Sequence, residues 1–178
     1  MIRIFDNFLA DPYARREAAL KADYEPVPDP SGALFPGIAQ YESDDWAFMQ
    51  NNLPGKPAYE FFRLTLANDK LPTFIHNDLS MARTTGILFL NEPETEAGGT
   101  AFWRHKEQNC DSINPKEDPS QYVADGLDET KWECRRIVEM RFNRLILFDS
   151  ALWHSPFPRA GWGDSPANGR LIQVYFFP

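Results

Sequence analysis

Four side chains, widely spaced in the sequence, have types that together could bind a metal ion and a carboxylate ligand. His76 and Asp78 are two residues apart, His154 follows much later, and Arg170 lies beyond it. Two neutral imidazoles and one carboxylate suit ferrous iron and leave coordination positions open. An arginine binds a carboxylate through two parallel hydrogen bonds, so Arg170 could hold a dicarboxylate beside the metal. This set indicates oxygen chemistry at non-haem iron.

The spacing of histidine and acid is a weak signal, because 26 of the 178 residues are acidic and chance pairs are expected. His105 and Glu107 have the same spacing. They open a charged stretch, and no apolar strand follows to hold them as rigidly as a metal site requires. We therefore favour His76 and Asp78, with His154 as the third ligand. The His105 pair and a protein without a metal remain as alternatives.

The elements that must position these residues are mainly strands. If residues 73–79 are extended, His76 and Asp78 project from the same face, because side chains alternate along a strand. Residues 84–90 form an almost continuous apolar run, which is typical of a strand buried on both faces. Further strands are predicted at residues 59–66, 100–103, 137–142, 145–148 and 171–177. Several short strands preceded by helices favour a mainly β sandwich or barrel with flanking helices.

The N-terminal part, residues 1–58, is expected to support these strands. Asp11 and Pro12 predict a helix start, since an aspartate accepts free amide hydrogens and a proline suits the first helical position. Residues 24–37 are rich in proline and glycine and predict an irregular segment. Residues 43–52 predict a second, short helix.

Residues 104–136 differ from the strands around them. They are charged, contain Pro115 and Pro119, and have few aliphatic side chains. A long loop within a compact domain usually carries function or moves. We interpret this segment as a surface insertion that could form one wall of a pocket. An insertion far from any site is the alternative.

Composition and charge are those of one folded domain over residues 1–178, with its core over 59–178. The chain is 43% hydrophobic and 14% aromatic, which excludes a disordered protein. Its net charge of -8 argues against a general nucleic-acid or anionic-membrane binder. We find no secretory signal segment and no membrane span, so we expect a cytoplasmic protein in which Cys110 and Cys134 are free thiols.

Arg170 opens the apolar stretch of residues 170–177, where an unpaired charge is costly to bury. A ligand carboxylate is the partner that we favour, and a carboxylate of the protein is the alternative. Arg159 lies nearer to His154 in the sequence, but it stands in a loop rich in proline and glycine and is less well anchored.

Five sequence stretches carry a family resemblance: FIHND, TTGILFLN, AGGTAFW, FNRLILFDSALWHS and GRLIQVYF, all within residues 61–177. Together they resemble the 2-oxoglutarate and Fe(II)-dependent oxygenases, nearest to the prolyl-4-hydroxylase-like branch. The resemblance implies a double-stranded β-helix, which is a cupin-like jelly roll, with N-terminal helices. It implies Fe(II), 2-oxoglutarate and O2 as cofactors. It maps the metal ligands onto His76, Asp78 and His154, and the 2-oxoglutarate anchor onto Arg170.

The resemblance implies a dioxygenase that hydroxylates a C–H bond of a small molecule, an amino acid or a peptide side chain. A second contact to 2-oxoglutarate, often a tyrosine or lysine in the family, has no clear counterpart. By position its candidates are Arg63, Thr65 and Thr85. Two other functions remain open: a non-catalytic jelly-roll binding module, and a cupin-type metalloprotein that does not use 2-oxoglutarate.

Overall fold

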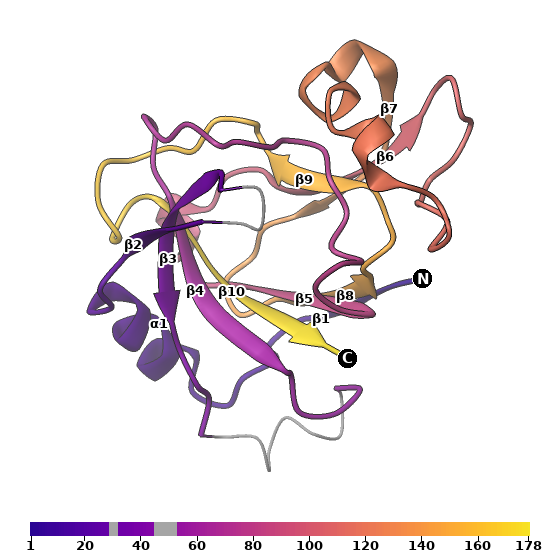
Figure 1. The fold of residues 1–178 in the computed structure, drawn as a ribbon. Coiled ribbons are helices and arrows are strands. Elements are labelled where there is room, and N and C mark those ends of the chain that lie inside the picture. Colours follow the sequence, from indigo (N-terminus) through magenta and orange to yellow (C-terminus); the bar gives the residue numbers. More distant parts are fainter. Residues whose placement is uncertain (29–31, 45–52) are drawn as a thin grey trace.

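The computed structural model describes residues 1–28, 32–44 and 53–178, which form two facing β-sheets (Figure 1). Within these residues the larger sheet has seven strands, in the order β1 (Ile2–Phe5), β8 (Leu145–Asp149), β5 (Thr84–Phe89), β10 (Arg170–Phe177), β4 (Tyr59–Thr65), β3 (Leu34–Gln40) and β2 (Glu25–Pro28). The smaller sheet has three, in the order β7 (Trp132–Glu139), β6 (Gly99–His105) and β9 (His154–Phe157). Neighbouring strands pair antiparallel throughout. The predicted mainly β class with a sandwich architecture is confirmed.

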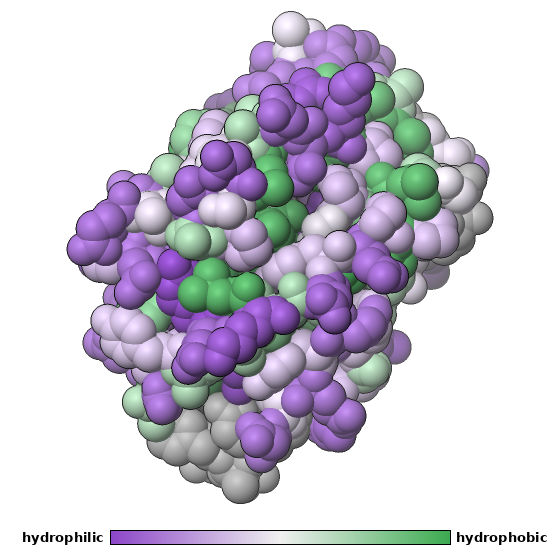
Figure 2. All heavy atoms as spheres, turned by 90° about the vertical axis from the view of Figure 1, so that its left-hand side faces the viewer, coloured by the Kyte–Doolittle hydropathy of each residue, from purple (hydrophilic) through white to green (hydrophobic). Residues whose placement is uncertain are grey.

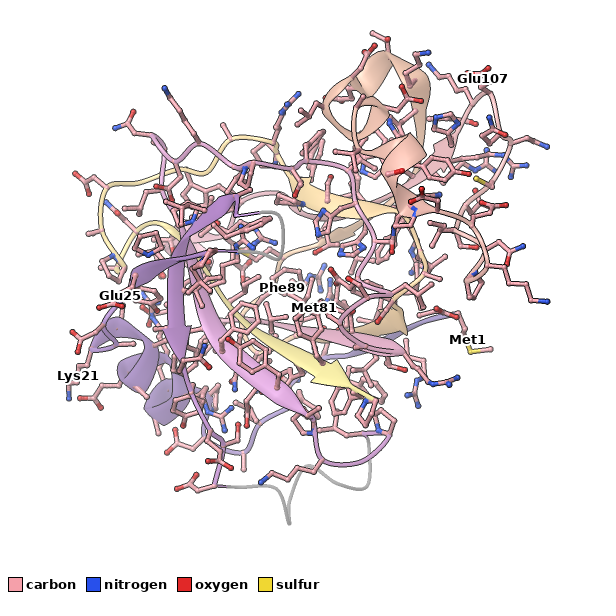
Figure 3. All side chains as sticks on the ribbon, viewed as in Figure 1. Met1, Lys21, Glu25, Met81, Phe89 and Glu107 are labelled. Atoms are coloured by element: carbon pink, nitrogen blue, oxygen red, sulfur yellow. The ribbon has the colours of Figure 1, made fainter. Side chains whose placement is uncertain are left out.

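Both faces of the larger sheet are buried, because its side chains alternate between the two sides. The inner core, toward the smaller sheet, contains Phe61, Ile87, Phe89, Phe102, Phe148 and Val174. The outer core, under the helix α1 (Pro12–Leu20), contains Ala19, Phe62, Leu64, Leu88, Leu171 and Tyr175. Phe89, labelled in Figure 3, is fully buried. Burial on two sides explains why residues 84–90 lack polar alternation.

The helix α1 begins as predicted. The side chain of Asp11 accepts a hydrogen bond from the Ala14 amide (3.0 Å), and Pro12 occupies the first turn. The helix is anchored by buried arginines, since Arg15 Nη1 donates to Gln173 Oε1 (2.5 Å) and Arg16 Nε donates to Glu92 Oε2 (3.0 Å).

The second predicted helix, over residues 43–52, lies mostly outside the described residues. No described helix is long and apolar enough to cross a membrane.

The described part of residues 24–37 is not irregular, contrary to the prediction. They contain β2 and most of β3, which pair with each other at the edge of the larger sheet. An edge strand has one row of unpaired amides, so β2 tolerates its prolines there. Gly37 has a φ of 69°, and a Cβ there would lie 1.9 Å from the Leu64 carbonyl oxygen. Glycine therefore allows β3 to approach β4 at this point.

Most predicted strands occur within two residues of their expected bounds. Residues 137–142 are an exception, because β7 already begins at Trp132 inside the predicted insertion. Residues 73–79 are the other exception and form no regular strand. Their amides bond to separate segments instead: Ile75 to the Gly126 carbonyl (2.9 Å) and Asp78 to the Ser150 carbonyl (2.8 Å). A strand needs a neighbouring ladder, and this segment does not have one.

The predicted insertion, residues 104–136, overlaps two strands, because β6 ends at His105 and β7 begins at Trp132. Between them it forms the short 3-10 helices η2 (Pro119–Tyr122), η3 (Asp125–Leu127) and η4 (Glu129–Lys131), and a further one, η1 (Pro93–Thr95), precedes β6. Ile113, Tyr122 and Trp132 are buried against Phe74 and Trp153. The segment is thus packed through aromatic side chains, which the low aliphatic content did not reveal.

Candidate metal centre

A short antiparallel bridge places His76 and His154 opposite each other. The His76 amide donates to the His154 carbonyl (3.0 Å), and the His154 amide donates to the His76 carbonyl (2.9 Å). His154 is the first residue of β9, in the smaller sheet, whereas His76 lies in the connection between β4 and β5. The two imidazole ring centres are consequently only 4.5 Å apart.

Asp78 completes a group of three possible metal ligands with these histidines. Its Oδ2 lies 3.3 Å from His154 Nε2, and its Oδ1 lies 3.7 Å from His76 Nε2. All three donor atoms lie within 4.8 Å of one another. Two ligand atoms bound at right angles to one metal, each about 2.1 Å from it, are about 3 Å apart. Small side-chain adjustments are therefore enough to bring these atoms to one ion.

Both histidines are oriented by their own backbone. His76 Nδ1 bonds to the Phe74 carbonyl (2.8 Å), and His154 Nδ1 bonds to the Leu152 carbonyl (3.0 Å). A carbonyl oxygen only accepts, so each Nδ1 carries the hydrogen. This tautomer leaves both Nε2 lone pairs directed at the site. Such support of a metal-binding imidazole is typical of protein metal sites.

Asp78 is oriented by two hydroxyl groups. Thr85 Oγ1 donates to Asp78 Oδ2 (3.0 Å) and lies 2.8 Å from Ser150 Oγ. Thr85 was predicted as a contact of the dicarboxylate; it lines the cavity, and its hydroxyl bonds to the Asp78 carboxylate. Ser150 is fully buried and was not expected from the sequence. Only its place in the stretch before His154 hinted at a role.

The charge states of His76 and Asp78 suit metal binding. Burial, with the neighbouring His154, lowers the pKa of His76 to about 4, so this imidazole is neutral at pH 7. Burial alone would raise the pKa of Asp78, but His154, His76 and the Thr85 hydrogen bond hold it at about 2. Burial opposes the charge of His154 as well, yet Asp78 raises its pKa overall, so a metal ion would compete with a proton at this imidazole. The neutral His76 beside the Asp78 carboxylate is the pair that a divalent cation requires.

His105, the alternative candidate, is a core histidine with both ring nitrogens engaged. Its Nε2 lies 2.9 Å from Asp125 Oδ2, and its Nδ1 accepts from the Gln108 amide (3.1 Å). It is 1% exposed and packs edge-on against Trp132. Glu107 is exposed and points away from the body of the protein at the far end of the insertion (Figure 3). The structure does not bring this pair together with a further ligand.

Arg170 lines the same cavity as the three candidate ligands. It is 3% exposed, and its Nη2 donates a long hydrogen bond of 3.4 Å to the Gly99 carbonyl. Its Nε and the buried hydroxyl of Thr100, also in the cavity wall, have no partner among the described residues. An unpaired buried donor costs free energy, so these two groups are suited to bind a polar ligand. Thr100 was not predicted, although it follows the Gly98-Gly99 turn.

Arg63 is the second guanidinium in this cavity wall. It lies on β4 opposite Ile172 of β10, two positions from the pair formed by Thr65 and Arg170. Burial and the charge of Arg63 lower the pKa of Arg170 to about 9. Burial lowers the pKa of Arg63, and the negative charge of Asp78 partly offsets this lowering. An anion between the two guanidinium groups would relieve their repulsion.

The other two candidates are placed differently. Thr65 lines the cavity beside Arg170. Arg159 does not line it, because its guanidinium stacks on the Phe74 ring (4.7 Å) and donates to the Leu127 carbonyl (3.1 Å). The structure thus separates Arg159 from the carboxylate-binding candidates and gives it a packing role at the insertion.

Comparison with known families identifies the chain directly. Residues 69–177, more than half of it, match the model of a family of unknown function (DUF6445). The protein belongs to this family. No curated protein matches the sequence.

Solved structures show what this fold is shared with. The non-heme alpha ketoglutarate dependent carbocyclase SnoK from nogalamycin biosynthesis aligns with a TM-score of 0.57 and 13% identity, over 97% of this chain and 77% of SnoK. AviO1 from Streptomyces viridochromogenes aligns with a TM-score of 0.54 and 16% identity, over 97% of this chain and 87% of AviO1. The epimerase SnoN, solved with Fe3+, alpha ketoglutarate and nogalamycin RO, aligns with a TM-score of 0.54 and 12% identity, over 97% of this chain and 77% of SnoN. The fold is therefore the cupin-like β-sandwich of these proteins.

Proposed function

We propose that this protein is a 2-oxoglutarate- and Fe(II)-dependent dioxygenase that hydroxylates a C–H bond of a small molecule, an amino acid or a peptide side chain. One observation carries the proposal: a single cavity holds three possible metal ligands together with the guanidinium of Arg170, whose Nε has no partner among the described residues. A metal site by itself occurs in many proteins. A metal site that shares its cavity with a buried guanidinium, for which the described residues supply no carboxylate, is suited to a metal chelator that is also an anion.

The donor set fits ferrous iron. Two imidazoles and one carboxylate on one face leave the opposite positions open, which is the arrangement of non-haem iron oxygenases. The described residues within ligating distance are His76, Asp78 and His154. A structural zinc site is typically closed by a fourth protein ligand, which this cluster does not provide.

The cavity also fits 2-oxoglutarate. Arg170 and Arg63 supply two positive charges for a dianion, and the hydroxyls of Thr65 and Thr100 lie in the same wall. The paired strands β4 and β10 hold both arginines rigidly. We propose Arg170 as the anchor of the distal carboxylate and Arg63 as its second contact.

The side chains of this protein would divide the work among them. His76, Asp78 and His154 hold the metal, while Thr85 and Ser150 orient Asp78. The apolar wall, with Phe61, Ile87, Val174 and Phe176, excludes water from the cavity. Fe(II) and 2-oxoglutarate, when bound, would supply the oxidising power by activating O2. The protein contributes geometry and a dry site.

SnoK is a carbocyclase and SnoN is an epimerase, so their similarity to this chain supports the cofactor pair rather than one reaction outcome. We retain hydroxylation as the reaction, a double-stranded β-helix of the prolyl-4-hydroxylase-like branch as the finer classification, and a cytoplasmic location.

The decisive experiment is an anaerobic titration of the protein with Fe(II), first alone and then with 2-oxoglutarate. The expected result is a visible charge-transfer band that forms only when both are present. His76→Ala should abolish the band, and His105→Ala should retain it. Metal binding without the band would indicate a cupin-type metalloprotein, and no metal binding would indicate a non-catalytic module.

A further inference from the structure

A second hollow adjoins the metal cavity on the side of the insertion. It lies between residues 73–80 and the η2–η3 region, and its walls include Ile75, Ile113, Tyr122 and Val123. We call it the insertion groove. It shares Thr73 and His76 with the metal cavity, so a molecule lying in it reaches the edge of the metal site.

The walls of the insertion groove are mostly apolar. Ile75, Ile113 and Tyr122 are nearly fully buried and form its floor, whereas Val123 is 63% exposed at its rim. Trp153 supports the floor, since its ring centre is 4.7 Å from that of Tyr122. A rigid aromatic and aliphatic surface of this kind binds the apolar part of a ligand.

Glu117 is the only acidic side chain in the groove wall among the described residues. It is exposed, and its Oε2 accepts a hydrogen bond from the Tyr122 hydroxyl (3.1 Å). The described wall contains no lysine or arginine. The groove therefore carries negative charge.

The surrounding segment strengthens this sign. Residues 106–131 contain seven acidic and three basic side chains. The metal cavity has the opposite character, with Arg63 and Arg170 in its wall. The two adjoining hollows thus differ in charge, which would direct a dianion to one and a cation to the other.

We propose that the insertion groove binds the substrate, and that the substrate combines an apolar body with a protonated amine. The apolar body lies on Tyr122 and Val123, the amine pairs with Glu117, and the remaining end is presented to the metal beside His76. This inference rests on the proposed function for its catalytic meaning. It also explains why the insertion packs next to the site rather than away from it.

Binding can be tested on the metal-free protein with three probes of similar size: 2-phenylethylamine, 2-phenylethanol and phenylacetate. Trp153 lies at the groove floor, and Trp132 packs against Trp153, so tryptophan fluorescence reports binding. We expect the amine to bind most tightly and the carboxylate most weakly. Added salt should weaken binding of the amine but not binding of the alcohol.

The variant Glu117→Gln keeps the shape of the side chain and removes its charge. It should weaken amine binding roughly fivefold, as expected for an exposed ion pair, and leave alcohol binding unchanged. Glu107→Gln is the matched control, because Glu107 is an exposed acid of the same insertion outside the groove.

Equal binding of amine and carboxylate, no binding of any probe, or equal effects of the two variants would overturn the proposal. Since no metal is present, the outcome is independent of the Fe(II) and 2-oxoglutarate titration. If the amine binds but the titration fails, the groove proposal stands and the oxygenase proposal is rejected. If the titration succeeds but the amine does not bind, the oxygenase proposal stands and the groove proposal is rejected.

Discussion

Replacing Arg170 separates a ligand-binding role from a structural one. The guanidinium is 3% exposed, its Nε is unpaired among the described residues, and burial with Arg63 lowers its pKa to about 9. In the free protein this charge is therefore unfavourable. Replacing a poorly paired buried charge by an apolar side chain of similar size is often neutral or stabilising. Arg170→Met should leave the melting temperature of the metal-free protein unchanged or raise it.

The effect on 2-oxoglutarate should have the opposite sign. Arg170→Lys keeps a charge but loses the planar fork, and one charge-assisted hydrogen bond is worth about 2 kcal/mol, or roughly thirtyfold in affinity. Arg170→Met loses both parallel bonds, which corresponds to about 3–4 kcal/mol and several hundredfold. The affinity for Fe(II) alone should hardly change, since Arg170 is not among the metal-ligating group.

Two measurements check this reasoning. Anaerobic titration at saturating Fe(II) gives the 2-oxoglutarate affinity, and thermal unfolding without metal gives the stability. Arg135→Met serves as a control, because Arg135 is exposed and forms an ion pair with the exposed Glu133. Unchanged 2-oxoglutarate affinity in folded Arg170→Met would refute the anchor and direct attention to Arg63. A large loss of stability would instead show a structural role.

Three further predictions concern the metal and the insertion. His76→Ala should abolish iron-dependent succinate formation with little change in fold, whereas His105→Ala should lose stability but keep Fe(II) binding; the reversed pattern would move the site to the insertion. Thr85→Val should weaken Fe(II) binding about tenfold through loss of the hydrogen bond to the metal-binding carboxylate, and Thr84→Val should not, as isothermal titration can show. Amide hydrogens of residues 106–131 should exchange faster than those of the central strands and slow on substrate binding, which mass spectrometry of deuterium uptake measures; uniform slow exchange would contradict a mobile wall.

Local sequence patterns were sufficient for much of the fold. The apolar run at residues 84–90 predicted β5, and Asp11 with Pro12 predicted the start of α1. These signals are local, because an apolar run and a helix cap are visible in adjacent residues. The edge strands were missed because they have no such local signal. The proline-rich β2 is acceptable only because it lies at an edge, which depends on its distant partners.

The site shows the same division. Residue type and spacing selected His76, Asp78 and His154 as candidates, and the structure places their donor atoms together. The reason given for their common orientation was wrong, since residues 73–79 are not a strand. The bridge to His154, which is a tertiary contact, positions His76 instead.

By itself, the sequence determined which side chains were available for chemistry and that the chain would bury enough apolar surface to form a β-sandwich. These properties follow from composition and from the period of two along a strand. The tertiary structure alone decided that Thr85 and Ser150 support Asp78 and that Arg63 shares a cavity with Arg170. It also decided that the insertion lies beside His76. Each of these facts depends on which distant segments pack together, and no local pattern encodes that choice.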